Sequence, residues 1–187
     1  QNRAVSSILN NKNKFSGVFG TVAQLGQVKK KYSQALASAA GARSQFLVVK
    51  DDRTAAECIS YLKSNKLGSA SFIPLNKIKS FEPNNEDLKL LKQNGVHDFA
   101  INLVSFNPQY KKAFAYLFGK TLIVEDIHTA RNVGIGKVKM ATLNGNIAES
   151  SGVMKGGFMN NRRVAFQEKD SLEELEKLDG VISEQQG

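Results

Sequence analysis

The groups in this chain best suited to chemistry are backbone groups in a glycine-rich stretch. Residues 143–158 read LNGNIAESSGVMKGGF and hold four of the 15 glycines in the 187-residue chain: Gly145, Gly152, Gly156 and Gly157. Successive backbone N–H groups can bind an anion such as a phosphate. A backbone without Cβ atoms also lets a strand from a second chain approach closely. A third interpretation is a series of tight turns that need positive φ.

The phosphate interpretation is the weakest of the three. The pattern G-x-x-x-x-G-K-[ST] is absent from this stretch and from residues 134–139, GIGKVK. A dinucleotide fingerprint needs a strand, a glycine turn and then a helix, and no helix start follows Leu143. We therefore disfavour a small nucleotide-binding enzyme and expect no cofactor.

The histidines and the single cysteine do not form a recognisable site. His97 and His128 lie in unrelated sequence contexts without a partner at metal-ligand spacing, so a surface or capping role is expected for both. Cys58 falls on the apolar face of an expected helix and is predicted to be a packed thiol. No metal site is predicted.

Three aspartates recur at matching places. Asp51, Asp52 and Asp126 each follow an apolar run and precede Thr54 or Thr129. An aspartate just before a helix accepts hydrogen bonds from the first free N–H groups, so turn or cap roles explain the pattern without acid–base catalysis. The chain is predicted to be a non-enzyme.

Positive charge is concentrated in two blocks of the chain, whose net charge is +9. Residues 12–80 hold 12 Lys/Arg against 3 Asp/Glu, and residues 109–166 hold 9 against 3. Such blocks attract phosphate backbones without sequence preference, although ordinary solvated lysines give the same count. The candidate nucleic-acid-binding residues are Lys29, Lys30, Lys31, Lys111, Lys112, Lys155, Arg162 and Arg163.

The two basic blocks also repeat one another. Residues 32–41 (YSQALASAAG) align with 110–119 (YKKAFAYLFG), 46–55 (FLVVKDDRTA) with 121–130 (TLIVEDIHTA), and 72–76 (FIPLN) with 140–144 (MATLN). Each copy reads as a helix ending at glycine, a short strand, a second helix and a second strand. The pattern predicts a mixed α/β (α+β) fold with two related lobes, 16–80 and 109–166, joined by a connector, 81–108.

The two ends read as helical stubs of coiled-coil character. Residues 3–9 (RAVSSIL) carry apolar residues at helical spacing, and residues 170–178 (DSLEELEKL) carry a capping box at Ser171 and Glu174. We assign 1–15 as an incoming stub and 167–187 as a returning one.

Membrane insertion and secretion are not expected. No apolar run approaches the ~20 residues that cross a bilayer, and the first residues lack the apolar region of a signal peptide. A lone cysteine favours a reducing compartment, which predicts an intracellular protein.

The spacing G-x6-G-x3-G-G from Gly145 resembles the hinge domain of structural maintenance of chromosomes (SMC) proteins. SGVFGTVAQLGQVKKKYSQAL (16–36), YLKSNKLGSASFIPLNKI (61–78) and SSGVMKGG (150–157) extend the resemblance from about residue 16 to 163. It implies a two-lobed hinge that forms a ring-like dimer with an identical or related SMC hinge. The interface residues implied are Gly145, Gly152, Val153, Met154, Gly156 and Gly157.

The resemblance also implies a chromosome-associated protein that binds DNA weakly and without sequence specificity, favouring single strands. Full-length SMC proteins are ATPases through domains that these 187 residues do not include, so no activity is carried over. The alternative is a monomeric basic nucleic-acid-binding module whose glycines only shape turns.

Overall fold

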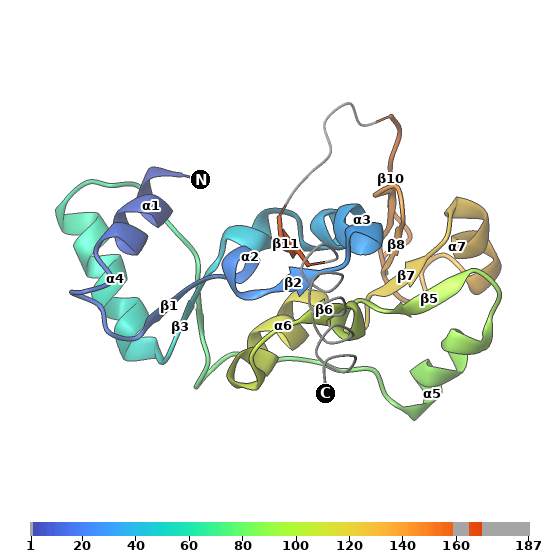
Figure 1. The fold of residues 1–187 in the computed structure, drawn as a ribbon, viewed down its shortest axis with the longest axis horizontal. Coiled ribbons are helices and arrows are strands. Elements are labelled where there is room, and N and C mark those ends of the chain that lie inside the picture. Colours follow the sequence, from blue (N-terminus) through green and yellow to red (C-terminus); the bar gives the residue numbers. More distant parts are fainter. Residues whose placement is uncertain (1, 159–164, 170–187) are drawn as a thin grey trace, which may run out of the picture.

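The computed structural model describes residues 2–158 and 165–169 (Figure 1). The first half contains α1 (Arg3–Asn10), β1 (Val18–Thr21), α2 (Val22–Leu25), β2 (Gln27–Val28), α3 (Lys30–Ala40), η1 (Gly41–Gln45), β3 (Leu47–Val49), α4 (Asp52–Ser64) and β4 (Phe72–Pro74). Then follow α5 (Asn85–Leu88), η2 (Lys89–Lys92), β5 (Val96–Phe99), η3 (Ala100–Leu103), β6 (Val104–Ser105), η4 (Pro108–Tyr110), α6 (Lys111–Phe118), β7 (Leu122–Val124), α7 (Ile127–Val133), β8 (Met140–Thr142), β9 (Ile147–Ala148), β10 (Met154–Lys155) and β11 (Gln167–Glu168). The expected mixed α/β architecture is confirmed.

Three sheets organise these strands. Their orders are β1-β3-β4, β10-β9-β8-β7-β5 and β11-β2-β6. In the first sheet β1 is antiparallel and β4 parallel to β3, and in the second β5 is antiparallel and β8 parallel to β7. Leu47 lies opposite Phe72, and Leu122 lies opposite Met140. The strand registers therefore match the repeat that was aligned in the sequence.

The second unit begins earlier than the sequence repeat indicates. Val96–Phe99, inside the expected connector 81–108, forms β5 and pairs with β7, just as β1 pairs with β3. The strand register shifts at the same place in both pairings, between Val18 and Gly20 and between Val96 and Asp98. The two strand sequences, VFGT and VHDF, share only their first residue, which is why the sequence alone did not reveal the match.

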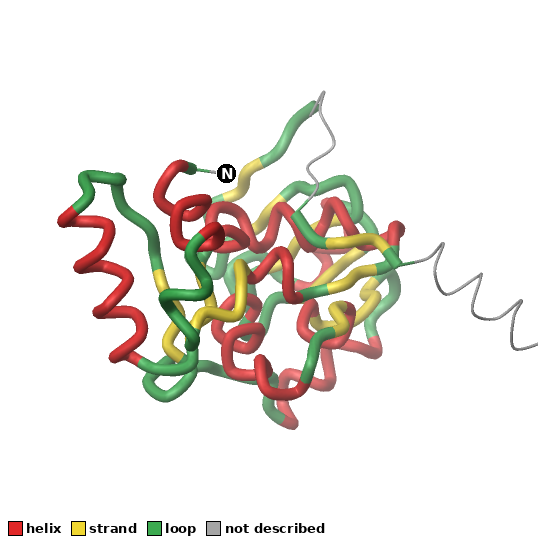
Figure 2. The backbone as a smooth tube through the Cα atoms, turned by 60° about the vertical axis from the view of Figure 1, so that its left-hand side comes forward, coloured by secondary structure: helices red, strands yellow, loops and turns green. Residues whose placement is uncertain are grey.

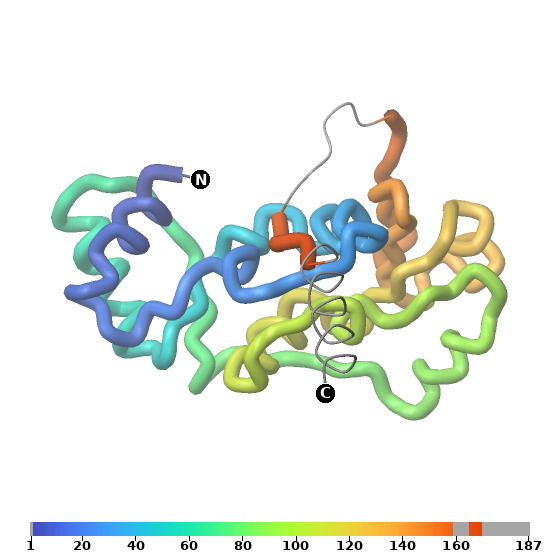
Figure 3. Tube along the Cα trace, in the orientation of Figure 1, coloured from blue at the N-terminus to red at the C-terminus, as the bar shows by residue number. Residues whose placement is uncertain are grey.

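Each central strand is buried on both faces. Val48 and Ile123 contribute to a core shared by the two units, whereas their neighbours point into separate outer cores. Leu47 packs with α1 and α4, and Leu122 packs with α7. Figures 1 and 3 show α1 and α4 at the end of the molecule that holds β3, and α7 at the end that holds β7. Because side chains alternate across a strand, each sheet needs helices on both sides.

The helix boundaries follow local rules that the sequence displays. α3 and α6 end at Gly41 (φ +56°) and Gly119 (φ +50°), whose N–H groups donate to Ala37 and Ala115 carbonyls. Helix α1, expected in the incoming stub, packs Val5 and Ile8 into the outer core beside Cys58. The expected returning helix at 170–178 lies outside the described residues.

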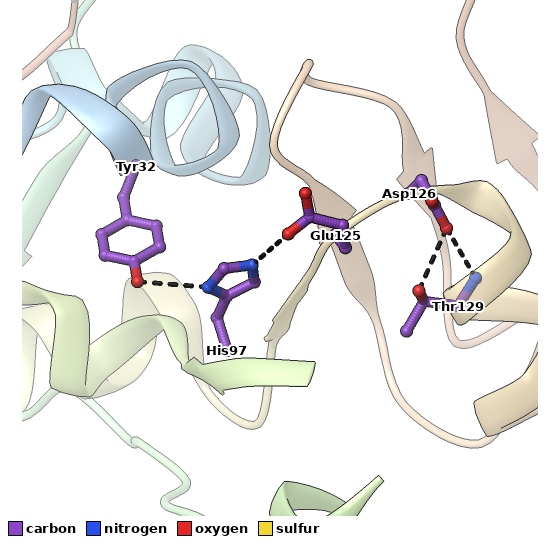
Figure 4. A network of polar contacts seen from close by, with 5 residues as sticks. All are labelled: Tyr32, His97, Glu125, Asp126 and Thr129. Carbon is purple, nitrogen blue, oxygen red and sulfur yellow. Dashed lines mark hydrogen bonds and ion pairs between the residues drawn. The ribbon is translucent and has the colours of Figure 1, made fainter. Parts of the chain in front are cut away.

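Helix α3 connects the first unit to the second sheet. It lies against β8, where Lys139 Nζ donates to the Ala39 carbonyl (2.9 Å) and Gln34 Nε2 donates to the Asn144 carbonyl (3.0 Å). Near its N-terminus, the Tyr32 Oη is 3.2 Å from His97 Nδ1, and His97 Nε2 is 2.6 Å from Glu125 Oε2 (Figure 4). The surface or capping role expected for His97 is wrong, because its side chain is 16% exposed and joins the two units.

The expected aspartate caps are present. Asp51 Oδ1 accepts from the Thr54 hydroxyl (2.7 Å) and N–H (2.8 Å), and Asp126 Oδ1 accepts from the Thr129 N–H (2.9 Å) and hydroxyl (3.0 Å) (Figure 4). Asp52 has a different role, since its carboxylate accepts from Asn76 Nδ2 (2.7 Å).

The caps predict an acid-dependent loss of stability. Hydrogen bonds from Thr54 and Thr129 lower the pKa of Asp51 and Asp126 in the folded state. Their contribution is therefore complete above the unfolded pKa of about 4 and disappears as the pH falls through the folded values. The double variant Asp51→Asn, Asp126→Asn keeps cap acceptors. Its thermal unfolding midpoint should fall less steeply below about pH 4 than that of the wild type; parallel curves would contradict this account.

The Tyr32 hydroxyl is predicted to stabilise the junction of the two units. Tyr32→Phe removes the hydrogen bond between the half-buried Tyr32 hydroxyl and His97. The free energy of unfolding, measured by urea denaturation, should fall by about 1 kcal/mol. Tyr110→Phe is the matched control, because Tyr110 aligns with Tyr32 in the repeat, lies at the N-cap of α6 and packs its ring on Phe19. Equal losses in the two variants would show that the His97 contact contributes nothing.

Candidate functional site

The glycine-rich stretch forms the outermost part of the second sheet. It runs from the β8–β9 turn through β9 and β10, and β10 stands out from the rest of the fold in Figures 1 and 2. Gly145 (φ +88°) closes the first turn by donating to the Thr142 carbonyl, and Gly152 (φ +98°) closes the second by donating to the Glu149 carbonyl. These two glycines fit the turn interpretation, because L-residues rarely adopt such φ values.

Gly156 and Gly157 differ in their surroundings. A Cβ on Gly156 would collide with the side chain of Asn146, whose Oδ1 also accepts from the Gly157 N–H (3.2 Å). Gly156 is thus needed for a contact within this chain. Gly157 (φ +136°) and Gly152 have no atom within 4 Å of an added Cβ, so both face open space.

The outer edge of β10 has unpaired backbone groups. Met154 lies opposite Ala148, and the Glu149 N–H donates to the Val153 carbonyl (2.7 Å), so Val153 and Lys155 direct their backbone groups toward β9. Alternation then points the N–H and C=O of Met154 and Gly156 outward. In the described part of the chain, no strand pairs with this side of β10.

Exposed apolar side chains accompany this edge. Val153 is 62% exposed, Met154 47% and Phe158 91%. A free strand edge with apolar side chains is a template for pairing with another chain.

The first sheet has β1 at one edge and β4 at the other, and β4 offers much less backbone than β10. Leu47 N–H donates to the Ser71 carbonyl and Leu75 N–H donates to the Val49 carbonyl, so Phe72 and Pro74 face away from β3. Pro74 has no N–H, and its carbonyl accepts from Lys77 and Ile78 in a turn. Phe72 is therefore the β4 residue that presents both groups outward.

A groove of about 590 Å³ lies between the C-terminal end of α3 and the β9–β10 segment. Its charged lining residues are Arg43, Lys139, Lys155 and Glu149, and Phe158 stands at its rim. The sequence did not identify Arg43, Lys139 or Phe158 as site residues, because they come from separate segments that only the packing of α3 on β8 brings together.

The candidate lysines occupy two helix N-termini. Lys29 precedes α3, whose first residues are Lys30 and Lys31, and α6 begins at Lys111 and Lys112. All five are exposed, and neither helix has an acidic residue in its first turn. Lysines there oppose the helix dipole, so both helix ends concentrate positive potential. Lys155 lies on β10, and Arg162 and Arg163 lie outside the described residues.

The Tyr32–His97–Glu125 series has the chemical types of a proton relay but not the setting of an active site. The Tyr32 hydroxyl contacts His97 (Figure 4). None of the three residues lines the groove beside β10. Cys58 is fully buried, which confirms the predicted packed thiol. Burial raises its thiol pKa to about 11.

Two other kinds of site have no candidate in the part of the chain that the structure describes. No three His, Cys, Asp or Glu residues there are grouped so as to hold a metal ion. Likewise, none of the described helices has both the length and the apolar character that a membrane span requires.

Comparison with known proteins gives a consistent family. The family model for "SMC proteins Flexible Hinge Domain" matches residues 15–134, ending before the glycine-rich stretch. The chromosome partition protein Smc of Synechocystis sp. is 45% identical over 146 residues, which cover 78% of this chain and 12% of that protein. The Smc of Aquifex aeolicus is 42% identical over 142 residues, 75% of this chain and 12% of that protein. The chain therefore spans only a small part of the length of these relatives.

Solved structures extend the match to the fold. The Geobacillus stearothermophilus SMC hinge domain, crystallised as an asymmetric dimer, superposes with a TM-score of 0.82 at 26% identity, covering 97% of this chain and 74% of that one. The Pyrococcus furiosus SMC hinge domain gives a TM-score of 0.74 at 33% identity, covering 87% and 84%. Because the family match covers more than half of the sequence and the fold agrees over nearly all of it, this chain belongs to the hinge-domain family of SMC proteins.

Proposed function

We propose that this chain is a non-catalytic dimerisation hinge that joins two SMC subunits through its sheet edges. The observation that carries the proposal is the free edge of β10, where the backbone groups of Met154 and Gly156 face outward beside exposed Val153 and Phe158. The Geobacillus stearothermophilus hinge domain was crystallised as a dimer, which supports self-association of this chain.

The two sheets offer edges of different kind, and this suggests how the chains pair. β10 of one chain would add to the β4 edge of the partner at Phe72, and the same contact would repeat in the opposite sense. Two such contacts related by a twofold axis close the dimer and leave neither β10 edge free. The open space at Gly152 and Gly157 would let the partner's backbone come close.

In this proposal the partner is an identical or related SMC hinge, and the dimer links subunits of a chromosome-associated complex. The relatives named chromosome partition protein Smc support that setting. The alternative, a monomeric nucleic-acid-binding module, would leave the exposed edge of β10 without a role.

The dimer interface is tested by placing charge on β10. The variant Val153→Glu, Met154→Glu puts carboxylates at both copies of the contact and should weaken dimerisation by about 100-fold or more in sedimentation equilibrium. Circular dichroism should show an unchanged fold, because both side chains are exposed. Ile59→Glu on α4 is the control, since Ile59 is similarly exposed (52%) on another element. A double variant as dimeric as the control would reject this interface.

We also propose that the hinge binds DNA weakly and without sequence specificity. The support is the placement of exposed Lys29, Lys30 and Lys31 at one helix N-terminus and Lys111 and Lys112 at another. Lysines so placed cost helix stability yet strengthen the field that attracts phosphates. Lys111 is partly neutralised, since its Nζ lies 3.3 Å from Glu82 Oε1.

Salt dependence tests this second proposal. If Lys29, Lys30 and Lys31 each contact a phosphate of duplex DNA, replacing all three with glutamine should reduce the slope of log affinity against log salt by about 2.7. Fluorescence anisotropy across a salt series measures that slope. The thermal midpoint should not fall, because the lysines oppose the α3 dipole. Replacing Lys63, Lys66 and Lys92 instead serves as the charge-matched control, and equal slopes for both triple variants would refute the assignment.

A further inference from the structure

The turn between β8 and β9 is held by hydrogen bonds of its own side chains. The buried Thr142 hydroxyl accepts from the Asn146 N–H (3.0 Å) and donates to Asn144 Oδ1. The Thr142 N–H donates to the Asn146 carbonyl (2.9 Å), so backbone and side chains close the turn together. From α3, Gln34 Nε2 donates to the Asn144 carbonyl (3.0 Å). The backbone of Asn146 is therefore fixed relative to both units.

The regular pairing of β9 with β10 ends at Lys155. Lys155 lies opposite Ile147, the first residue of β9, and a continued antiparallel ladder would next join the Gly157 N–H to the Gly145 carbonyl. Gly145 instead lies in the turn, with φ +88°. The Gly157 N–H donates to the side-chain Oδ1 of Asn146 (3.2 Å). One side-chain oxygen thus takes the place of the backbone acceptor that β9 no longer offers.

The same side chain determines how Gly156 is presented. In the continued register Gly156 lies opposite Asn146, and a Cβ on Gly156 would collide with the Asn146 side chain. Because the hydrogen bond to Asn146 directs Gly157 inward, alternation turns the N–H and C=O of Gly156 outward. The outward edge of β10 therefore includes Gly156 as well as Met154 while Asn146 holds Gly157.

We infer that Asn146 is a positioning residue for dimerisation, because its side chain extends the free edge of β10 by one residue. The inference rests on the proposed pairing of β10 with a second chain. Asn146 acts through Gly157 and lies on the inner side of the strand, away from the edge that the partner would use. The absence of a side chain at Gly156 is then a requirement of Asn146 in the same chain.

Removing the acceptor tests this role in the full 187-residue chain. Asn146→Ala removes one hydrogen bond at each of the two copies of the contact, which should weaken dimerisation by about 30-fold in sedimentation equilibrium. Asn146→Asp keeps an oxygen that accepts from the Gly157 N–H and should restore dimerisation to within about threefold of the wild type.

Asn65→Ala is the control for both variants. Asn65 lies at the C-cap of α4, and its Nδ2 donates to the Tyr61 carbonyl (2.9 Å). The control variant therefore also loses one hydrogen bond from an asparagine side chain to the backbone, but far from β10. Circular dichroism on every variant shows whether the fold is kept.

A double-mutant cycle tests why Gly156 has no side chain. Gly156→Ala alone should weaken dimerisation about as much as Asn146→Ala, because the new Cβ displaces the Asn146 side chain. In the Asn146→Ala background only the Cβ of residue 146 remains nearby, at 3.1 Å, so the same change should add less than about threefold. A full loss in both backgrounds would show that the partner, not Asn146, excludes the side chain, and would overturn the inference.

Hydrogen exchange at the Gly157 amide measures the positioning without the dimer. The background is the variant Val153→Glu, Met154→Glu, which the proposed interface expects to be monomeric. There the Gly157 N–H should exchange about fivefold faster after Asn146→Ala than with Asn146 or after Asn146→Asp. Equal exchange rates in the three chains would show that Asn146 does not hold the strand.

The outcomes separate this inference from the proposal beneath it. If the wild type is monomeric at every concentration, the proposed dimerisation and the role of Asn146 in it fail together. If the wild type dimerises and Asn146→Ala behaves like Asn65→Ala, the dimer stands and the role of Asn146 is wrong. A loss in Asn146→Ala that Asn146→Asp does not restore would assign the effect to packing of the turn rather than to the acceptor, which also overturns the inference.

Discussion

The structure depends on one constraint: the central strands β3 and β7 are apolar on both faces, and neither unit covers both faces by itself. Leu47, Val48 and Val49 are fully buried, as are Leu122, Ile123 and Val124. Helices α4 and α7 cover the outer faces, and the inner faces meet the shared core that contains α3 and α6. Because each unit completes the other, the duplicated halves form one body rather than two independent lobes.

The shared core also determines where the surfaces of interest lie. Packing α3 on β8 brings Arg43 and Lys139 to the same groove as β10, although these residues are far apart in sequence. The same packing sets the Tyr32 hydroxyl against His97, which in turn contacts Glu125. At the other junction the ring of Phe19 meets that of Tyr110. The units therefore share the same strand pairing but differ in polar contacts. Among the described residues, the β9–β10 extension belongs to the second sheet.

Stability and binding place opposite demands on several charged residues. Lysines at the N-termini of α3 and α6 oppose the helix dipoles, whereas Lys139 is favourably placed at the C-terminal end of α3 through the Ala39 carbonyl. Fold stability alone does not explain why the first group is cationic. The proposed binding of a polyanion would give those lysines a purpose, whereas the enclosed Lys139 serves the fold through the Ala39 carbonyl.

The sequence by itself determined the features that depend on neighbouring residues: the aspartate caps at Asp51 and Asp126, the helix stops at Gly41 and Gly119, the strand repeat and the family. Local hydrogen bonds and backbone angles decide the caps and the helix stops, so short motifs reveal them. The repeat and the family are visible because short segments resemble one another or a known pattern. Only the tertiary structure decided that β5 belongs to the second sheet, that His97 joins the units, and that the Asn146 side chain leaves no room for a Cβ on Gly156. Those features arise from contacts between distant segments, and such contacts form only when two incomplete halves bury their sheets against each other.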